Sequence, residues 1–331
     1  MRTVFVLEIT TDCPRNCSYC FARKTKERME CLDEVIDFLK EQNDIVVVFF
    51  GGEPLLERES INYIIEKLGK KKYILCSGVP KGYEAELEEL SKNCILYLSY
   101  NGIYNDEMRE GKSMDFDFIV DVIQKGRKIS SYRLNFPPNY NKEKYIESVL
   151  PLIVETKDMI YFSLGIDKMS IINKDVKYAE DYFWVLENLC EKIKNFNPVH
   201  KVGICCSRSA RTGQAGFNMC GSGSNFLYID VKGNIYPCFM DRWENGIKLG
   251  NIREGFIRLP ITEIENKCNG LGFHYCRCPW TRKRLSRGIS RYMPNEFLCW
   301  FTQNVNKILE RYQEIIIGFV PKIRGEKIKC L

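Results

Sequence analysis

Three cysteines, Cys13, Cys17 and Cys20, lie within eight residues near the start of the chain. Four thiolates close a metal site, whereas three leave one coordination position open. Three thiolates on one tight loop can hold three irons of a cubane cluster and leave the fourth iron for another ligand. The spacing also fits a zinc site with a distant fourth ligand, or free buried thiols.

A second motif, Gly51-Gly52-Glu53-Pro54, follows an apolar run at 45–50. Two glycines let a backbone approach a ligand closely, and Pro54 stiffens the turn. The same four residues also occur in ordinary turns. The motif therefore indicates a binding site only in combination with the cysteines.

A second group of cysteines lies in the last third of the chain, where helical periodicity fades. Its members are Cys220, Cys238, Cys268, Cys276, Cys278 and Cys299. A stretch so poor in regular structure needs cross-links, and metal clusters would serve. One structural zinc held by four thiolates is the alternative. Within this region, residues 224–238 predict a β-hairpin that turns at 231–234.

The first 200 residues alternate short β-rich runs with helix-like segments. The expected strands cover 3–9, 45–50, 72–75, 94–99, 132–136 and 159–166, and the expected helices cover 29–42, 57–70, 82–92, 115–130, 141–156 and 174–196. Six β-then-α units predict a parallel sheet with helices outside it. The predicted fold class is α/β: a partial (β/α)6 barrel of the TIM type with a small, loop-rich, cysteine-dense C-terminal domain.

Polar residues follow each of the first four expected strands. The cysteine loop follows the first, 51–54 the second, Cys76 the third, and Ser99 and Asn101 the fourth. The carboxyl ends of parallel barrel strands meet at one rim. The sequence therefore predicts a single site built from these positions. We expect domain limits of 1–200 for the barrel, 201–300 for the cysteine-dense domain and 301–331 for a helix and basic tail.

Composition limits the classes of protein that the chain can belong to. It has 331 residues, 16 cysteines and two histidines, His200 and His274. So few histidines argue against Ser-His-Asp or Cys-His catalysis and against His-rich zinc sites. No export signal is visible, so we expect a cytoplasmic protein whose clustered cysteines bind metal or catalyse rather than form disulfides. The net charge of +6 fits an anionic small molecule, a peptide or a nucleic acid.

The Cys-x3-Cys-x-aromatic-Cys loop, with Gly-Gly-Glu-Pro after the second strand, resembles the signature of radical S-adenosylmethionine (SAM) enzymes. The resemblance implies a [4Fe–4S] cluster on Cys13, Cys17 and Cys20 whose open iron binds SAM. Tyr19, just before the last cysteine, would present its ring beside that ligand.

The same resemblance implies roles for residues after the second and fourth strands. It assigns the backbone of Gly51, Gly52, Glu53 and Pro54 to the amino group of SAM. Ser99 and Asn101 stand where peptide-modifying members carry a Ser-x-Asp-Gly turn, with Asn in place of Asp. Both are implied to lie near SAM or substrate, and a plain turn is the alternative.

The later cysteines resemble the SPASM extension, which carries auxiliary iron–sulfur clusters in peptide-modifying radical SAM enzymes. Cys220, Gly233 and Cys238 fit its opening pattern. The second half of the pattern is one cysteine short, and six cysteines cannot fully ligate two clusters that need four each. Either one cluster keeps an open iron, or Cys205 or Cys206 is recruited, or only one auxiliary cluster forms.

The resemblance implies an enzyme that generates a 5′-deoxyadenosyl radical and modifies a peptide or protein, through a thioether or C–C crosslink or through residue oxidation. The catalytic base is not identified, and the candidates are Asp241 and Cys76. In anaerobic sulfatase maturases an Asp directly follows the equivalent of Cys238 and serves as a base. Here Phe239 takes that place, which disfavours a maturase.

Two further hypotheses remain from the sequence. One is a radical SAM enzyme that acts on RNA or a small-molecule precursor through the basic segments 208–216 and 282–291. The other is a zinc-binding protein without catalytic activity.

For the leading hypothesis we expect a peptide or protein substrate and an electron donor such as ferredoxin or flavodoxin. Because the first expected strand begins at residue 3, leader recognition would need a separate leader-binding protein. We expect neither a membrane nor a nucleic acid as partner.

Overall fold

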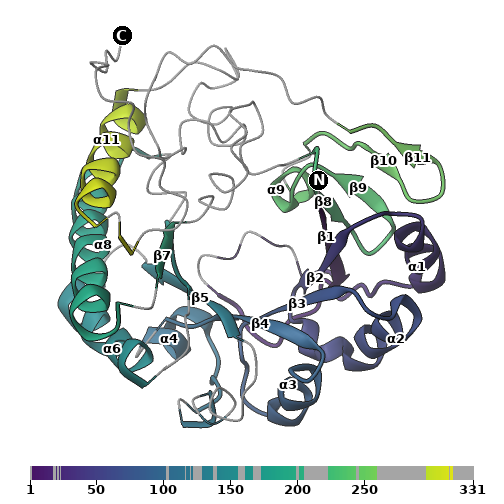
Figure 1. Cartoon of the computed structure of the whole chain (residues 1–331), viewed down its shortest axis with the longest axis horizontal. Coiled ribbons are helices and arrows are strands. Elements are labelled where there is room, and N and C mark those ends of the chain that lie inside the picture. Colours follow the sequence, from purple (N-terminus) through teal and green to yellow (C-terminus); the bar gives the residue numbers. More distant parts are fainter. Residues whose placement is uncertain are drawn as a thin grey trace. The chain divides into compact units, whose positions relative to one another are not determined.

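The computed structural model describes most of the first half of the chain and selected segments of the second (Figure 1). The described residues are 2–17, 20, 22, 24–101, 104–115, 117–119, 121, 129–136, 140–155, 161–166, 173–198, 201–204, 223–243, 246–258, 296–312 and 314–315. The chain forms two compact units. The first contains Met1–Tyr100, Tyr104–Tyr132 and Gly221–Pro260, and the second contains Asn101–Ile103, Arg133–Cys220 and Ile261–Leu331.

The first unit is built on a parallel sheet in the order β1 to β4. Its strands are β1 (Thr3–Thr10), β2 (Ile45–Gly51), β3 (Lys72–Ser77) and β4 (Cys94–Ser99). The alternating elements are α1 (Leu32–Lys40), the 3-10 helix η1 (Pro54–Glu57), α2 (Arg58–Leu68) and α3 (Glu84–Leu90), and the short α4 (Asn105–Arg109) follows β4. The predicted β-then-α order and parallel pairing are confirmed here.

A segment from far along the chain extends the same sheet on the other side of β1. Strand β8 (Phe226–Ile229) pairs in parallel with β1, and β9 (Asn234–Tyr236) pairs antiparallel with β8. The hairpin predicted over 224–238 is therefore confirmed. Two-residue strands β10 (Gly250–Asn251) and β11 (Gly255–Phe256) continue the sheet, and α9 (Phe239–Trp243) follows β9.

Asp230 shapes the hairpin turn. Its Oδ1 accepts hydrogen bonds from the backbone N–H groups of Lys232 and Asn234, both at 2.9 Å. Gly233 has φ 77°, a conformation that glycine adopts without steric cost. This hairpin lies beyond the expected barrel limit at residue 200, yet it belongs to the same compact unit as β1. The domain limits themselves stay predictions.

The second unit contains β6 (Tyr161–Ile166) in parallel with β7 (Lys201–Ile204), and the second half of β5 (Ile129–Phe136). Its helices are α6 (Lys142–Glu155), α8 (Val176–Phe196) and α11 (Glu296–Arg311). Asp175 caps α8 by accepting a hydrogen bond from the N–H of Tyr178 at 2.9 Å. Tyr182 of α8 packs on Phe301 of α11, with ring centroids 5.6 Å apart.

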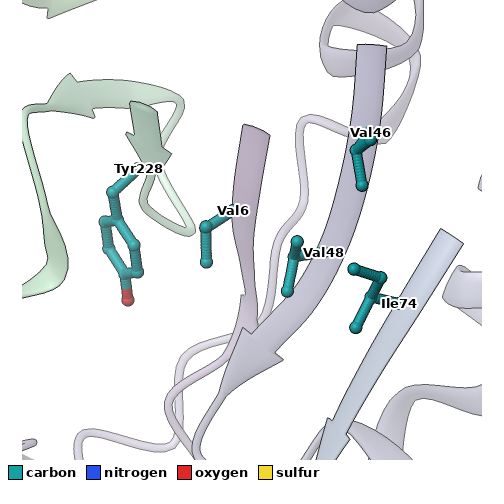
Figure 2. Close-up of a cluster of buried hydrophobic side chains, with 5 residues drawn as sticks. All are labelled: Val6, Val46, Val48, Ile74 and Tyr228. Atoms are coloured by element: carbon teal, nitrogen blue, oxygen red, sulfur yellow. The ribbon is translucent and has the colours of Figure 1, made fainter. Parts of the chain in front are cut away.

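Both faces of the first unit's strands are buried, as the continuous apolar runs predicted. Phe5, Leu7 and Val47 on one face are fully buried, and the ring of Phe5 packs edge-on against Phe38 of α1. Figure 2 shows the other face, where Val6, Val46, Val48, Ile74 and Tyr228 form one cluster across four strands. Tyr228 brings the hairpin into this cluster. Within the described residues, no helix has the length and apolar character needed to cross a membrane.

Replacing Leu75, which is fully buried in β3, with Ala is expected to lower the free energy of unfolding by about 2–5 kcal/mol, because a cavity forms in a closely packed layer. The matched control is Ile257→Ala at a side chain that is 77% exposed, where we expect a change within about 0.5 kcal/mol. Urea unfolding measures both. Equal losses for the two variants would contradict this core assignment.

Candidate active site

The cysteine loop follows the end of β1, and hydrogen bonds between neighbouring residues of the loop stabilise it. The N–H of Cys13 donates to Oδ1 of Asp12 at 2.8 Å, and the N–H of Cys20 donates to the carbonyl of Cys17 at 3.0 Å. Cys13 and Cys17 are half-buried, Cys20 is exposed, and all three are free thiols. The tight loop that the spacing predicted is present.

The Gly-Gly-Glu-Pro segment contacts this loop through its backbone. The N–H of Gly52 donates to the carbonyl of Thr10 at 2.7 Å, and the N–H of Glu53 donates to the carbonyl of Asp12 at 2.8 Å. A Cβ at Gly51 would lie 2.1 Å from the carbonyl oxygen of Thr10, and one at Gly52 would lie 1.9 Å from that of Asp12. Only glycine fits at either position. Besides the ligand role that the sequence predicts for them, these glycines allow a close approach of two backbones within the protein.

Glu53 connects the Gly-Gly-Glu-Pro segment to the residues just after β3. Its fully buried carboxylate accepts hydrogen bonds from the N–H of Gly78 at 2.9 Å and from the N–H of Leu55 at 3.2 Å. Burial raises the pKa of the Glu53 carboxyl, while these two backbone hydrogen bonds lower it. Pro54 is buried at the start of η1. The segment thus joins the ends of β1, β2 and β3.

Arg15, inside the cysteine loop, connects this loop to two others, a role that was not predicted from the sequence. Its Nη2 donates to the carbonyl of Val79 at 2.8 Å and to that of Lys112 at 3.0 Å. Val79 has φ 52°, which is strained for a β-branched residue. The N–H of Asn16 donates to the carbonyl of Arg109 at 3.1 Å. The loops after β3 and β4 therefore hold the cysteine loop as well.

The thiols of this loop fit an iron–sulfur cluster by their chemistry. Burial raises the pKa of Cys13 to about 11, so the free thiol is protonated at neutral pH. A coordinating metal deprotonates a thiol outright. In the described residues no three Cys, His, Asp or Glu side chains gather around a single point as ligands of one metal ion. Cysteines that bind a cubane ligate different irons and do not need to converge in that way.

Cys238 lies at the end of the hairpin in the same compact unit. It is half-buried, and its Sγ donates to Oδ2 of Asp241 at 3.4 Å. Phe239 stacks on Phe50 of β2 with ring centroids 5.8 Å apart. Of the other predicted ligands, Cys220, Cys268, Cys276 and Cys278 lie outside the described residues, as does Tyr19, and only the backbone of Cys299, in α11, is described.

The remaining predicted residues have these locations. Ser99 is the half-buried last residue of β4, and Asn101, two residues later, is fully buried. Cys76 lies on β3 and packs against the cluster of Val6, Val46, Val48, Ile74 and Tyr228. Asp241, besides binding Cys238, accepts from the N–H of Ile247 at 3.4 Å. Both candidate bases thus have structural contacts.

A buried acid, Glu8, faces the same interior as the cluster and was also missed. The hydroxyl of Tyr228 donates to its Oε1 at 2.7 Å, and Nε of Arg242 lies 3.7 Å from its Oε2 and 3.2 Å from Asp230. Burial raises the pKa of Glu8 to about 7, while the Tyr228 hydrogen bond and the Arg242 charge lower it. A single Glu in an apolar strand pattern gives no sign of such partners.

A cavity of about 290 Å3 lies in the second compact unit, beside the first turns of α6 and α8. Three of its polar side chains have structural roles. Asn141 and Asp175 accept hydrogen bonds from helix N–H groups, and Asp181 pairs with Lys142 at 2.7 Å. None of the predicted site residues lines it.

Gly52→Ala is expected to cost about 3 kcal/mol of unfolding free energy or more, because its Cβ would overlap the Asp12 carbonyl. The same clash displaces the cysteine loop, so iron bound per chain should fall. Gly111→Ala is the control. A Cβ at residue 111 would lie 3.5 Å from its nearest neighbour, Cγ of Arg15, which is an ordinary van der Waals contact. Urea unfolding and iron analysis test both variants. Wild-type stability and iron content in Gly52→Ala would refute the contact.

Glu8→Gln is expected to change how stability depends on pH. Between pH 4.5, the ordinary pKa of a glutamate, and about pH 7, the unfolded chain releases the Glu8 proton and the folded chain keeps it. The free energy of unfolding therefore falls as pH rises through this window, by up to about 3 kcal/mol. Glu8→Gln should remove this part of the slope in urea unfolding between pH 5 and 8. Tyr228→Phe should steepen it, because the lost hydrogen bond favours the ionised carboxylate. Identical slopes in all three proteins would exclude this pKa.

Two family models match the chain. The radical SAM superfamily matches residues 7–152, and the iron–sulfur cluster-binding SPASM domain matches residues 220–264. An uncharacterized protein of Archaeoglobus fulgidus is 25% identical over 263 residues, which cover 72% of this chain and 61% of that relative. The chain thus spans less than two thirds of that relative's length.

Two solved structures show the same fold at low identity. Native anSMEcpe with bound AdoMet has a TM-score of 0.66 and 18% identity, with 95% of this chain and 99% of that chain covered. Streptococcus suis SuiB bound to S-adenosylmethionine has a TM-score of 0.56 and 17% identity, with 77% and 64% covered. These likenesses confirm the predicted α/β partial barrel. The two family models confirm the expected cofactor classes, a [4Fe–4S] cluster with SAM and auxiliary iron–sulfur clusters. The chain therefore carries a radical SAM domain and an iron–sulfur cluster-binding SPASM domain.

Proposed function

We propose that this protein uses SAM and a [4Fe–4S] cluster to modify a peptide or protein by radical chemistry. The observation that carries the proposal is the pairing of β8 with β1. It joins the SPASM segment to β1, which leads into the cysteine loop, so the strands of one sheet lead into both this loop and Cys238. An enzyme that needs a SAM cluster and an auxiliary cluster near one substrate would require such a connection.

In this proposal Cys13, Cys17 and Cys20 hold the cluster. When bound, the cluster and SAM supply a 5′-deoxyadenosyl radical, which removes a hydrogen atom from an unreactive C–H bond. The protein's own residues fix the geometry and exclude water. Gly52 and Glu53 hold the loop through backbone hydrogen bonds, and the interior beside it is lined by apolar and aromatic side chains.

The peptide class is supported by what the similar structures contain. SuiB has been solved with its precursor peptide SuiA, and anSMEcpe with a Cp18Cys peptide. At 17–18% identity these likenesses show a fold, so the peptide substrate of this chain is part of the proposal. A one-electron donor such as ferredoxin or flavodoxin and a leader-binding partner belong to it as well.

Phe239 makes a sulfatase maturase the weaker alternative. The position directly after Cys238 holds an aromatic ring that stacks on Phe50. The nearest acid, Asp241, accepts hydrogen bonds from Cys238 and from the backbone of Ile247. A proton acceptor at residue 239 is therefore missing, which favours a crosslink or oxidation that takes its proton acceptor from elsewhere.

The first test is SAM cleavage by anaerobically reconstituted protein with dithionite. We expect 5′-deoxyadenosine to form in the wild type and to fall to background in Cys17→Ala, because one iron loses its ligand. Cys94→Ala is the control, since this buried thiol lies at the start of β4, away from the strand ends that carry the site. Failure of the wild type to cleave SAM would end the proposal.

The second test concerns the substrate class. Small peptides encoded beside this gene are co-expressed with the wild type and with Cys17→Ala, and their masses are compared. A mass change that needs Cys17 supports peptide modification. SAM cleavage that responds to RNA or to a small molecule and leaves every peptide unchanged would favour the other substrate classes.

A further inference from the structure

Two arginines from different parts of the chain are buried against the cysteine loop. Arg15 lies within the loop and is 3% exposed, and Arg109 ends α4 and is 5% exposed. A buried guanidinium is costly unless a nearby group compensates its charge. Because both arginines lie beside three cysteines, we ask which negatively charged group compensates their charge.

Arg109 points one of its N–H groups at a cysteine sulfur. Its Nη1 lies 3.9 Å from Sγ of Cys17, within hydrogen-bonding distance for sulfur. Nε of the same guanidinium donates to Oδ1 of Asn105 at 2.8 Å, and Asn105 in turn bonds the hydroxyl of Ser113. Because Asn105 is itself buried, the plane of the guanidinium is held in place.

Arg15 adds a second positive charge at short range. Its Nη2 is used by two carbonyls, whereas its Nε and Nη1 are buried and have no hydrogen-bond partner in the described part of the chain. Burial lowers the pKa of Arg15, and the neighbouring charge of Arg109 lowers it further. Two cations therefore lie close together where water is scarce.

The acidic groups nearby are Glu53 and Asp106. A Cβ on Gly78 would lie 3.0 Å from Nη1 of Arg109 and 3.3 Å from Oε2 of Glu53, so those two groups meet at Gly78. Glu53 already accepts two backbone hydrogen bonds, and burial raises the pKa of its carboxyl. Asp106 accepts from the N–H of Ser113 at 2.9 Å. These two carboxylates supply negative charge beside the arginine pair, and three thiolates on iron would add to it.

We propose that Arg109 and Arg15 set the reduction potential of the cluster that Cys13, Cys17 and Cys20 hold. The inference rests on that cluster, which is part of the proposed function. Reduction adds one electron from a one-electron donor and makes the cluster more negative. A buried cation and an N–H···S hydrogen bond stabilise the more negative state, so both raise the potential. Arg109 and Arg15 are thus positioning residues that make the cluster easier to reduce.

The test is a redox titration of the reconstituted protein followed by electron paramagnetic resonance. The signal of the SAM-binding cluster is identified by its change when SAM is added, and no peptide is present. Arg109→Gln and Arg15→Met should shift its midpoint potential to more negative values. Arg109→Lys should shift it less than Arg109→Gln, since the charge stays and the planar fork is lost. Lys24→Gln is the matched control, because Lys24 carries the same charge near Cys13 and Cys20 but is exposed to solvent.

A midpoint in Arg109→Gln and Arg15→Met equal to that of Lys24→Gln, at wild-type iron content, would overturn the inference. If Arg109→Gln loads no iron, Arg15→Met and Arg109→Lys decide by the same criterion. The result is independent of the substrate, because potential and iron content are measured without it. A protein that cleaves SAM but modifies no peptide would fail the proposed function and could still show the shift.

Discussion

The close approach of two backbones, Gly51–Glu53 and Thr10–Asp12, is the constraint on which the site depends. The hydrogen bonds of 2.7 and 2.8 Å between them leave no room for a side chain at either glycine. The strand register makes this contact possible. The pairing of β1 with β2 shifts between Glu8 and Thr10 and places Gly51 opposite Thr10. Such an irregularity re-aims the end of a strand. The cysteine loop begins directly after it, so its direction is set by backbone packing before any ligand is considered.

The hairpin on the other side of β1 depends on the same strand. Four residues of β8 pair with β1, and Tyr228 supplies both an apolar ring to the interior cluster and a hydroxyl to Glu8. A four-residue strand contributes little by itself, so side-chain contacts must stabilise its position. The arrangement also explains why an acid is tolerated inside the sheet. Glu8 has a phenol donor and a nearby guanidinium, which reduce the cost of burying it.

Periodicity and strand ends were enough to predict several of the described local elements. The helix predicted over 174–196 is observed as Val176–Phe196, and the one over 57–70 as Arg58–Leu68. The hairpin turn could be predicted because Gly233 and Asp230 leave a local signal. The parallel pairing of β8 with β1 could not, since it joins residues more than 200 positions apart and has no local pattern.

The candidate site shows the same division between local and long-range information. The three cysteines were found because their spacing is local. Arg15 and Arg109 were not, because an arginine in a polar segment normally extends into water, and only the fold brings these two together. The two glycines were noticed in the sequence, but their close approach to Thr10 and Asp12 was not predicted, since a sequence shows that a side chain is absent and not what lies in its place.

Charge is distributed unevenly over the interior of the first unit. Arg15 and Arg109 lie beside the cysteine loop, whereas Glu8 and Asp230 lie beside the hairpin with Arg242 between them. In a medium of low dielectric constant such groups act over several ångströms with little screening. A negative group held by Cys17 would be stabilised by the nearby cations, while the acids on the hairpin side favour neutral or positive groups. The cysteine loop after β1 and Cys238 after β9 thus have different electrostatic surroundings. This difference arises from side chains that the sequence places in separate elements.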